Sequence, residues 1–528
     1  MKRRKFIQKA GIGMAIPSLL GNLPLFANEN QSLLQEFLNP LVDTDHVLVL
    51  IYLGGGNDGL NTVIPIDSYT NLAAARNNIL IPESKTLKLN GLTKTALHPS
   101  LTGFQNLYNE GKLNIIQSVG YENQNFSHFR STDIWSSASD ADKTLDTGWL
   151  GRYLNEEFPG FPLNYPNSTN PDTLALQLFA NQPLLFLGPN AQMSMTLSDP
   201  NSLFQVWPNG INDAANNSPY GRELNYIRTI SKQSASYASA IVSKYTAGSN
   251  IGTYPADKYS FADVLKAIAR LIKGGSKTRL YLVNLYGFDT HSNQVDATNT
   301  AIGGHADLLK IISDAVYAFQ KDLEAMKLDD RVLGMTYSEF GRRIKSNDSL
   351  GTDHGAAAPL FVFGSKVQGG IIGKNPIIPS QISVNDNIPM QYDFRSIYSS
   401  ILKDWFCVGD ASLKNILLKS FQNLPIVNNN CSSTALDDLS ILEDRLQIKI
   451  YPNPVVSIAK VEVTVPSGIS HLSLIDPLGR VVRIIHSGQL LEGMHSFTIE
   501  RENLTRGNYY IRLQHKNGQK TAGLVFVD

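Results

Sequence analysis

The sequence has few cysteines, no excess of either charge and no hydrophobic run long enough to cross a membrane. Its 528 residues include two cysteines, and 46 basic residues balance 46 acidic ones. This balance gives no indication of a nucleic-acid-binding surface. The apolar segment at residues 10–20 is too short for a transmembrane helix and contains Pro17. We therefore expect no nucleic-acid partner and no permanent membrane span.

The two cysteines, Cys407 and Cys431, lie far from the N-terminus, so neither is placed for lipid attachment behind an export signal. In an oxidising compartment they could form a disulfide across the end of the main domain. Two free thiols are the alternative, and the sequence leaves both open.

Residues 1–28 have the features of a cleavable export signal. They begin with basic residues, continue into the apolar segment and end near the small residue Ala27. Arg3 and Arg4, followed by the letters KFI, resemble a twin-arginine signal, which exports proteins already folded. An ordinary secretory signal is the alternative. Removal of this segment deletes five basic residues and no acidic one, so the exported protein would be mildly acidic. The expected partner is the twin-arginine or the general secretory translocon.

Apolar runs alternate with amphipathic segments over residues 45–420. Residues 261–275 and 305–327 place apolar side chains three and four positions apart, as helices do. Continuous apolar runs are typical of strands buried on both faces of a parallel sheet, and they occupy residues 46–53, 113–120, 279–287, 331–341 and 360–364. The alternation predicts a three-layer α/β domain with a mostly parallel sheet. Residues 142–255, rich in Asn, Pro, Ser and Gly, are expected to form an irregular insertion or a helical cap.

The composition changes after residue 420. Residues 421–444 are expected to be a linker, and residues 445–528 alternate polar and apolar side chains between turns, which predicts a small all-β sandwich domain. The motifs "YPNP", "DPLGRVV" and "GNYYIRL" resemble the C-terminal sorting domain of the type IX secretion system. The resemblance implies passage through the periplasm and across an outer membrane, to a secreted or surface location. A generic β accessory domain is the alternative.

Acidic residues and histidines follow several of the predicted strands. Because the carboxyl ends of parallel strands meet at one edge of a sheet, we expect these side chains to converge there. Carboxylate and imidazole together suit Zn²⁺ or Mn²⁺, whereas Ca²⁺ or Mg²⁺ would use fewer histidines. Each pair alone could also be a hydrogen-bonded turn. The candidate ligands for one or two divalent ions are Asp58, Asp289, His291, Asp353, His354, Glu339 and His128, of which Glu339 could instead orient a ligand.

The stretch "NFSHFRSTDIW" adds candidates for catalysis. Ser127 precedes a predicted helix, where it could be a nucleophile activated by a metal ion, or could simply cap the helix. Arg130 and Arg342 could bind an anionic substrate through paired N–H donors.

Several motifs together resemble the secreted bacterial domain of unknown function family 1501. They include "LGGGNDGLNTVIP", "SHFRSTDIW", "GFDTHSNQ" and "SEFGRRIKSNDSLGTDHGAAAPLFVFG", within residues 47–406. That family is similar to the alkaline phosphatase-like superfamily of phosphatases and sulfatases, which use two metal ions in an α/β sandwich. The resemblance implies metal ligands at Asp58, Asp289 with His291, and Asp353 with His354, and a nucleophile at Ser127.

The sequence departs from that superfamily in three respects. Asp289 and His291 are separated by one residue, whereas the phosphatases space theirs more widely. A further histidine ligand is missing after His354 in the main domain, unless His98, His128 or His305 replaces it. No Cys-x-Pro-x-Arg motif occurs, which excludes the formylglycine nucleophile of sulfatases.

Two functions are possible as hypotheses. The first is a secreted metal-dependent hydrolase of phosphate or sulfate esters, acting on an anionic small-molecule or polymer substrate. The second is an exported binding or surface-assembly protein that keeps the fold without turnover.

Overall fold

The protein forms two compact units in the computed structural model, Met1–Cys431 and Ser432–Asp528. The structure describes residues 44–163, 165–197, 216, 218–428, 431, 446–465, 468–476, 480–491, 493–515 and 518–528. The expected export signal, with its twin-arginine motif, and most of the expected linker lie outside these residues. The expected domain limits themselves stay predictions.

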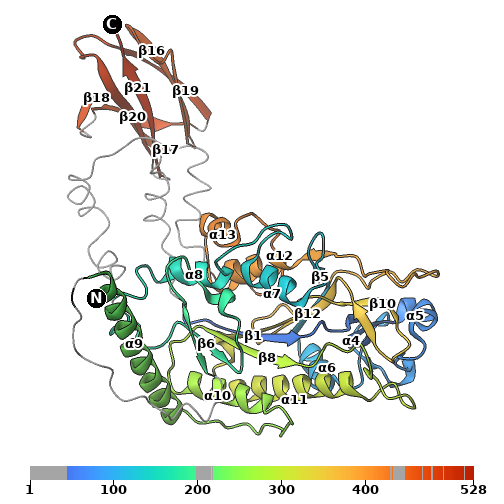
Figure 1. Ribbon diagram of the computed structural model, residues 1–528. Helices are drawn as coiled ribbons and strands as arrows, with labels where there is room; N and C mark the ends of the chain where they lie inside the picture. Colours follow the sequence, from blue (N-terminus) through green and yellow to red (C-terminus); the bar gives the residue numbers. More distant parts are fainter. Residues whose placement is uncertain are drawn as a thin grey trace. The chain divides into compact units, whose positions relative to one another are not determined.

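A nine-stranded sheet forms the centre of the first unit, with the path β13-β5-β12-β9-β1-β8-β6-β7 and β14 beside β5 (Figure 1). The central strand β1 pairs in parallel with both β8 and β9. Only β12 pairs antiparallel to its neighbours in this described sheet. The mostly parallel sheet expected from the sequence is therefore confirmed. The strands are β1 (Val47–Gly54), β5 (Leu113–Gly120), β6 (Ala175–Leu178), β7 (Ser194–Leu197), β8 (Leu280–Tyr286), β9 (Val332–Tyr337), β12 (Ala358–Phe363), β13 (Gly370–Ile372) and β14 (Tyr392–Asp393).

Helices cover both faces of this sheet, which confirms the layered α/β architecture (Figure 1). Successive side chains of a strand point to opposite faces. Leu50 of β1 accordingly packs in one apolar core and Ile51 in the other. The first core includes α7 (His128–Ser137), α8 (Trp149–Glu157), α12 (Phe394–Ser400) and α13 (Asp410–Leu417). The second includes α6 (Thr102–Asn109), α10 (Phe261–Lys273) and α11 (Gly304–Ala325).

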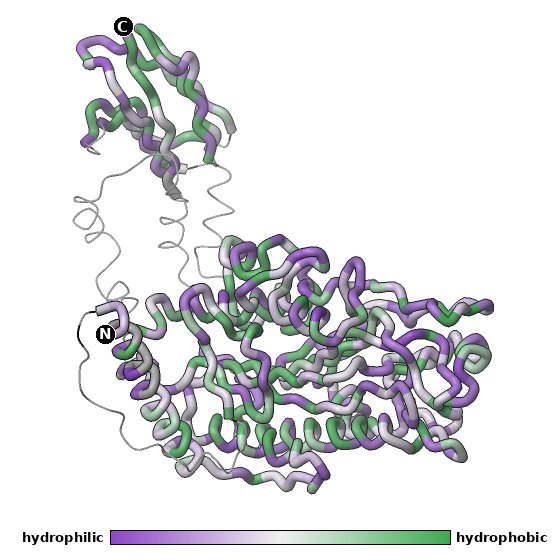
Figure 2. Tube along the Cα trace, viewed as in Figure 1, coloured by the Kyte–Doolittle hydropathy of each residue, from purple (hydrophilic) through white to green (hydrophobic). Residues whose placement is uncertain are grey.

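The helices expected at residues 261–275 and 305–327 are α10 and α11. Figure 2 shows hydrophobic segments along the central strands, and hydrophobic and hydrophilic residues alternating along both helices. Helix α10 ends at Gly274, with Arg270 and Lys273 in its last turn, where positive charge suits the helix dipole. The apolar faces of α10 and α11 pack against β1 and β8 in the second core.

Residues 142–255 are more regular than expected. They contain α8, the strands β6 and β7, and the long helix α9 (Pro219–Ala247). Strand β6 extends the central sheet by pairing in parallel with β8, and all four of its residues are buried. The strands are short and lie among turn-forming residues, so their apolar pattern does not stand out in the sequence.

Smaller elements shape the loops at one edge of the central sheet. Strands β10 (Arg342–Ser346) and β11 (Thr352–His354) form a separate antiparallel pair between β9 and β12. The other short elements are α4 (Gly59–Thr62), β2 (Val63–Pro65), α5 (Tyr69–Arg76), β3 (Leu87–Lys88) and β4 (Thr95–Leu97). Near the end of the unit, Cys407 and Cys431 form a disulfide. Of the two possibilities left open by the sequence, a disulfide or two free thiols, the structure shows the disulfide.

The second unit is an all-β region of antiparallel sheets, as predicted. One sheet has the order β15-β16-β19 and the other β18-β17-β20-β21. Alternate side chains such as Val461, Val463, Leu472 and Leu513 form its apolar core. The strands are β15 (Gln447–Tyr451), β16 (Ile458–Val465), β17 (Gly468–Ile475), β18 (Val481–Leu490), β19 (Gly493–Glu500), β20 (Gly507–His515) and β21 (Gly518–Phe526). In the part of the chain that the structure describes, no helix has the length and hydrophobicity to cross a membrane.

Candidate metal centre

Polar side chains from three loops meet at the sheet edge where the parallel strands end. Asp289 follows β8, and His128 begins α7 after β5. His354 ends β11, just before β12. Because β12 runs antiparallel to β9, its beginning lies at the edge where β9 ends. A residue that precedes this strand can therefore join residues that follow the others.

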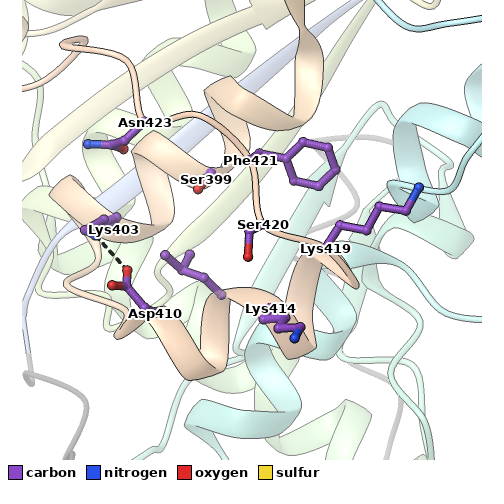
Figure 3. A pocket seen from close by; sticks show the side chains of 9 residues that line it. Ser399, Lys403, Asp410, Lys414, Lys419, Ser420, Phe421 and Asn423 are labelled. Atoms are coloured by element: carbon purple, nitrogen blue, oxygen red, sulfur yellow. Dashed lines mark hydrogen bonds and ion pairs between the residues drawn. The ribbon is translucent and has the colours of Figure 1, made fainter.

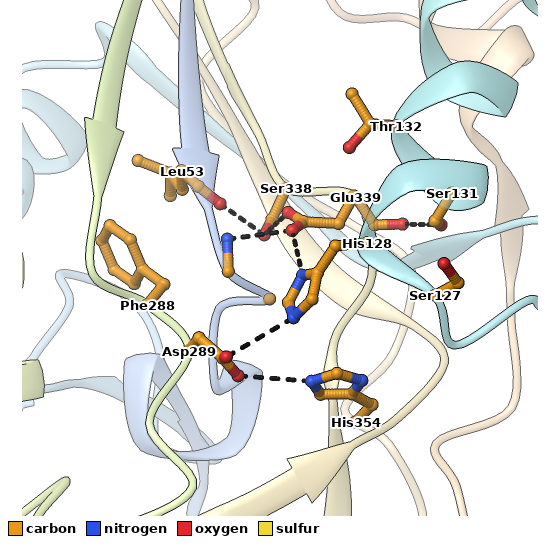
Figure 4. A network of polar contacts seen from close by, with 12 residues as sticks. Leu53, Ser127, His128, Ser131, Thr132, Phe288, Asp289, Ser338, Glu339 and His354 are labelled. Carbon is orange, nitrogen blue, oxygen red and sulfur yellow. Dashed lines mark hydrogen bonds and ion pairs between the residues drawn. The ribbon is translucent and has the colours of Figure 1, made fainter.

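The carboxylate of Asp289 is the centre of this group (Figure 4). Its Oδ2 lies 3.5 Å from His128 Nε2. Its Oδ1 lies 3.2 Å from His354 Nε2 and 3.3 Å from His291 Nε2. Arg342 Nη2 donates a hydrogen bond to Oδ1 at 2.7 Å. Three imidazoles and one guanidinium thus surround a single carboxylate.

The three histidines present the same nitrogen to Asp289 because the other nitrogen is already bonded. His354 Nδ1 lies 2.8 Å from the carbonyl oxygen of Phe126, which can only accept a hydrogen bond. His128 Nδ1 and His291 Nδ1 likewise face carboxylate oxygens, at 2.8 and 3.1 Å. Nε2 is therefore the atom that each ring presents to Asp289: in the neutral tautomer with Nδ1–H it offers a lone pair to a cation, and in the protonated ring it donates a hydrogen bond to the carboxylate.

This donor set fits a divalent metal ion. His128, Asp289 and His354 each offer one ligand atom, and these atoms all lie within 4.8 Å of one another. Imidazole and carboxylate suit Zn²⁺ and related transition metals. The His291 ring lies 4.6 Å from the His354 ring, centroid to centroid, so a further imidazole adjoins the group.

The acidic partners of His128 and His291 bond Nδ1 of each ring, whereas Nε2 faces Asp289. Glu339 is 1% exposed, and its Oε1 accepts hydrogen bonds from His128 Nδ1 at 2.8 Å and from the backbone N–H of Gly55 at 2.9 Å. Asp353, expected as a ligand, instead bonds His291 Nδ1 through Oδ1. Such partners fix the orientation of a metal-binding imidazole and raise its basicity.

The glycine-rich turn after β1 allows the loops to approach this closely. Gly55 has a φ of +124°, which other residues rarely adopt. A Cβ at this position would lie 2.2 Å from the backbone nitrogen of Asp289. Any side chain there would push apart the loop that carries Asp289 and the turn that holds Glu339.

The surroundings shift the pKa values of the central groups in opposite directions. Burial opposes ionisation of Asp289, but the hydrogen bond and charge of Arg342, with His354 and His291, lower its pKa overall. The hydrogen bond to Glu339 raises the pKa of His128. Burial lowers the pKa of His354. The His354 ring is therefore favoured in the neutral form that a metal ion requires.

Asp58, expected as a ligand, lies outside the group around Asp289. Its side chain is 0% exposed and accepts two hydrogen bonds from Arg76 Nη1, at 2.9 and 2.8 Å. It also caps α4 through the backbone N–H of Leu60. The carboxylate faces a buried arginine inside the protein, so the structure does not bring Asp58 into the group around Asp289 where the sequence analysis expected it.

The arginines expected to bind an anionic substrate are engaged elsewhere. Arg130 donates to the carbonyl oxygens of Asp140, Ala141 and Lys143. Arg342 is fully buried, and it donates to Asp289 and to the carbonyl oxygens of Gly55, Gly56, Phe288 and Thr352. Both arginines hold loops in place.

Ser127 occupies the N-cap position of α7, directly before His128, and is exposed. Its side chain makes no capping hydrogen bond. Figure 4 shows Ser127 beside the His128, Glu339 and His354 group. The helix-capping alternative thus lacks its hydrogen bond, and the hydroxyl is accessible.

Of the three histidines considered as an additional ligand, His128 is the one in the group. His98 and His305 lie together in the interior, with ring centroids 6.1 Å apart. His305 Nε2 bonds Asn57 Oδ1 at 2.9 Å, and His98 Nδ1 accepts from the backbone of Ser100.

Two residues that support the centre were not predicted from the sequence. Phe340 packs against both the His128 and His354 rings, at centroid distances of 4.9 and 4.6 Å. Gln294, fully buried, hydrogen-bonds Asp58. Neither residue has a sequence signal, because their contacts are set by the tertiary fold.

A cavity of about 270 Å³ lies elsewhere in the first unit, by α12 and α13 (Figure 3). An ion pair at 2.6 Å joins Lys403 and Asp410 in its wall. None of the candidate ligands lines it; its residues are Ser399, Lys403, Asp410, Leu413, Lys414, Lys419, Ser420, Phe421 and Asn423.

Residues 45–390 match the family described as "Protein of unknown function (DUF1501)". The chain belongs to the DUF1501 family. Residues 449–527 of this DUF1501 protein match the secretion system C-terminal sorting domain. Both recognitions expected from the sequence are confirmed. The sorting domain marks the protein for export by type IX secretion, to the cell surface or the medium.

Several solved structures are similar to this DUF1501 protein at low sequence identity. A protein in the alkaline phosphatase superfamily from Vibrio parahaemolyticus is 10% identical, with a TM-score of 0.30, over 90% of this chain and 79% of that chain. The PsFucS1 sulfatase from Pseudoalteromonas sp. is 12% identical, with a TM-score of 0.32, over 86% of this chain and 84% of that chain.

A shorter match involves PorZ, a surface component of the type-IX secretion system of Porphyromonas gingivalis. It is 12% identical, with a TM-score of 0.12, and covers 20% of this chain and 14% of PorZ. A search of curated protein sequences finds no match to this DUF1501 protein.

Proposed function

We propose that the protein is an exported metal-dependent hydrolase of phosphate or sulfate esters. One observation carries this proposal. His128, His291 and His354 each have Nδ1 bonded to an acceptor and Nε2 turned toward the carboxylate of Asp289. His128, Asp289 and His354 would hold the metal ion, Zn²⁺ or Mn²⁺ by the chemistry of the donors. When bound, the ion would polarise an ester oxygen and lower the pKa of a nearby hydroxyl.

The chain supplies a nucleophile and a site for negative charge beside these ligands. Ser127 is exposed and precedes His128 at the start of α7. Unpaired N–H groups in the first turn of a helix favour a bound anion. Ser127 Oγ would bond to the phosphorus or sulfur atom as the alcohol leaves with the hydroxyl proton. Water would then cleave the serine ester and release the inorganic anion.

The first test is the metal content of the mature protein, purified through its own export route without chelators and measured by elemental mass spectrometry. We expect one or two Zn or Mn ions per chain and hydrolysis of p-nitrophenyl phosphate or sulfate. His354→Ala should lose the metal, and Ser127→Ala should keep the metal and lose turnover. Asp307→Asn, an exposed change on α11, is the control. A protein that binds no added Zn²⁺ or Mn²⁺ while folded would refute the proposal.

A binding or surface-assembly protein is the second candidate. The observation that favours it is the burial of Arg342, whose three guanidinium nitrogens are all bonded to carbonyl and carboxylate oxygens and are not left for an anionic substrate. Metal binding at wild-type stability, without hydrolysis of either ester, would support this candidate over the hydrolase.

A further inference from the structure

A buried glutamine, Gln294, connects the loops that carry the candidate ligands. Its side chain is 0% exposed. Its Nε2 donates to Asp58 Oδ2 at 2.7 Å. Its Oε1 accepts from Thr290 Oγ1 and Thr352 Oγ1, each at 2.9 Å. One amide thus joins three segments that are far apart in the sequence.

Both threonines stand directly beside candidate ligands. Thr290 lies between Asp289 and His291, and Thr352 immediately precedes Asp353 and His354. The two loops also bond through their backbones, since Thr352 N–H donates to the Thr290 carbonyl at 3.1 Å. The contact is close, because a Cβ at Gly351 would lie 2.4 Å from a backbone atom of His291.

The chemistry of the site calls for an amide at this position. The two hydroxyls need an acceptor, and the ionised Asp58 needs a donor. A glutamine supplies both ends in one side chain. A glutamate would set a second carboxylate against Asp58, and an apolar residue would leave buried polar groups unpaired, which is costly.

We infer that Gln294 is a positioning residue of the metal centre, and that Asp58 and Arg76 hold it in place. The inference rests on the proposed metal-dependent function. Gln294 sets the separation of the two ligand loops through the hydroxyls of Thr290 and Thr352. Outer partners of this kind typically change metal affinity 10–100-fold when they are removed.

The test compares variants of the threonines, which keep the shape of the side chain and lose only the hydroxyl. Zinc affinity of the full mature protein is measured by calorimetric titration with ZnCl₂, and thermal stability is measured in parallel. We expect Thr352→Val to bind Zn²⁺ about 10–100-fold more weakly, and Thr352→Ser, which keeps Oγ, to restore the affinity.

Thr278→Val is the matched control. Thr278 is also buried and donates to the Thr173 carbonyl at 2.8 Å, but it precedes β8 at the opposite edge of the sheet. We expect it to lower thermal stability by a similar amount without changing zinc affinity. If Thr352 had only a general structural role, Thr352→Val and Thr278→Val would have similar effects on both zinc affinity and thermal stability.

The outcomes separate this inference from the proposed function. If the unaltered protein binds Zn²⁺ and Thr352→Val binds it equally well, the positioning role is overturned while the metal centre stands. If the unaltered protein binds no Zn²⁺ or Mn²⁺, the proposed function and this inference fall together. Gln294→Glu provides a second variant, expected to weaken zinc binding at least as much as Thr352→Val.

Discussion

Asp58 and Arg76 form an ion pair in which both side chains are completely buried, with Arg76 Nη1 2.8 Å from Asp58 Oδ2. Burial alone would raise the pKa of Asp58, but Arg76, His305 and the hydrogen bond from Gln294 lower it overall. The pair occupies the position where the sequence suggested a metal ligand. Its role is to anchor the turn after β1 against α5 and the β10 strand.

We expect Asp58→Ala to destabilise the protein strongly, because it leaves the Arg76 charge buried without a partner. Breaking a buried pair in this way costs about 3–5 kcal/mol. Urea unfolding of the mature protein measures the change. Asp314→Ala, which breaks the surface pair with Lys310 at 2.6 Å, is the control and should cost less than about 1 kcal/mol. Equal losses in the two variants would contradict this account.

Glu339→Gln should weaken metal binding while leaving the fold intact. The amide oxygen can still accept from His128 and Gly55, but the negative charge that makes the imidazole more basic is lost. We expect zinc affinity to fall by about tenfold, measured by calorimetric titration. Glu324→Gln, at the end of α11, also removes the charge of a bonded carboxylate and should leave zinc affinity unchanged. An unaltered affinity in Glu339→Gln would exclude the orienting role.

The buried pair His98 and His305 should make stability depend on pH. Burial lowers the pKa of His98 to about 3 and that of His305 to about 4. Both histidines have an ordinary pKa near 6.5 when unfolded, so the unfolded chain binds more protons below that pH. Their contribution to stability is therefore complete above pH 6.5 and is lost as the pH falls toward 4.

The variant His98→Gln tests this dependence. Each histidine steepens the fall in unfolding free energy by up to about 1.4 kcal/mol per pH unit. Between pH 4 and 6 the slope for His98→Gln should be shallower than that of the unaltered protein by about this amount. Parallel curves would show that His98 does not titrate on unfolding.

The Cys407–Cys431 disulfide closes a loop with a sequence separation of 24 residues. Closure of a loop of this length restricts the unfolded chain and stabilises the fold by about 3 kcal/mol. The double variant Cys407→Ser and Cys431→Ser should lower the unfolding free energy by about this amount. Thiol titration of the unfolded, unreduced protein should find no free thiol. Two reactive thiols there would contradict the bonded state.

The large apolar elements were readable from the sequence, because a strand buried on both faces needs an unbroken apolar run. Strands β1, β5 and β8 lie within two residues of the runs that predicted them. Strands β6 and β7 were missed, since strands of four residues in a polar segment carry too little pattern. Strand β12 runs antiparallel because the chain reverses through the β10–β11 pair after β9. Hydrophobic periodicity does not predict such a reversal.

The sequence predicted part of the candidate metal centre. Asp and His beside strand ends led us to expect that Asp289, His291 and His354 would lie together, and they do, because the topology brings those strand ends to one edge. Asp58 also follows a strand beside glycines, but it pairs with Arg76 of α5. Nothing in the sequence of α5 indicates this ion pair. Whether an acidic residue at a strand end faces the candidate metal group or a buried arginine depends on its burial and its long-range partners. Both are set only by the folded chain.

The disulfide also affects how the protein would withstand proteolysis once it is secreted. Cys431 is the last residue of the first unit, and its sulfur ties it back to Cys407, which lies just after the helical segment ending at Trp405. A protease that cut the chain after Cys431 would leave a covalently sealed end on the first unit. The new C-terminus would remain bonded to Cys407, so loss of the sorting domain would leave the end of the first unit attached to its fold.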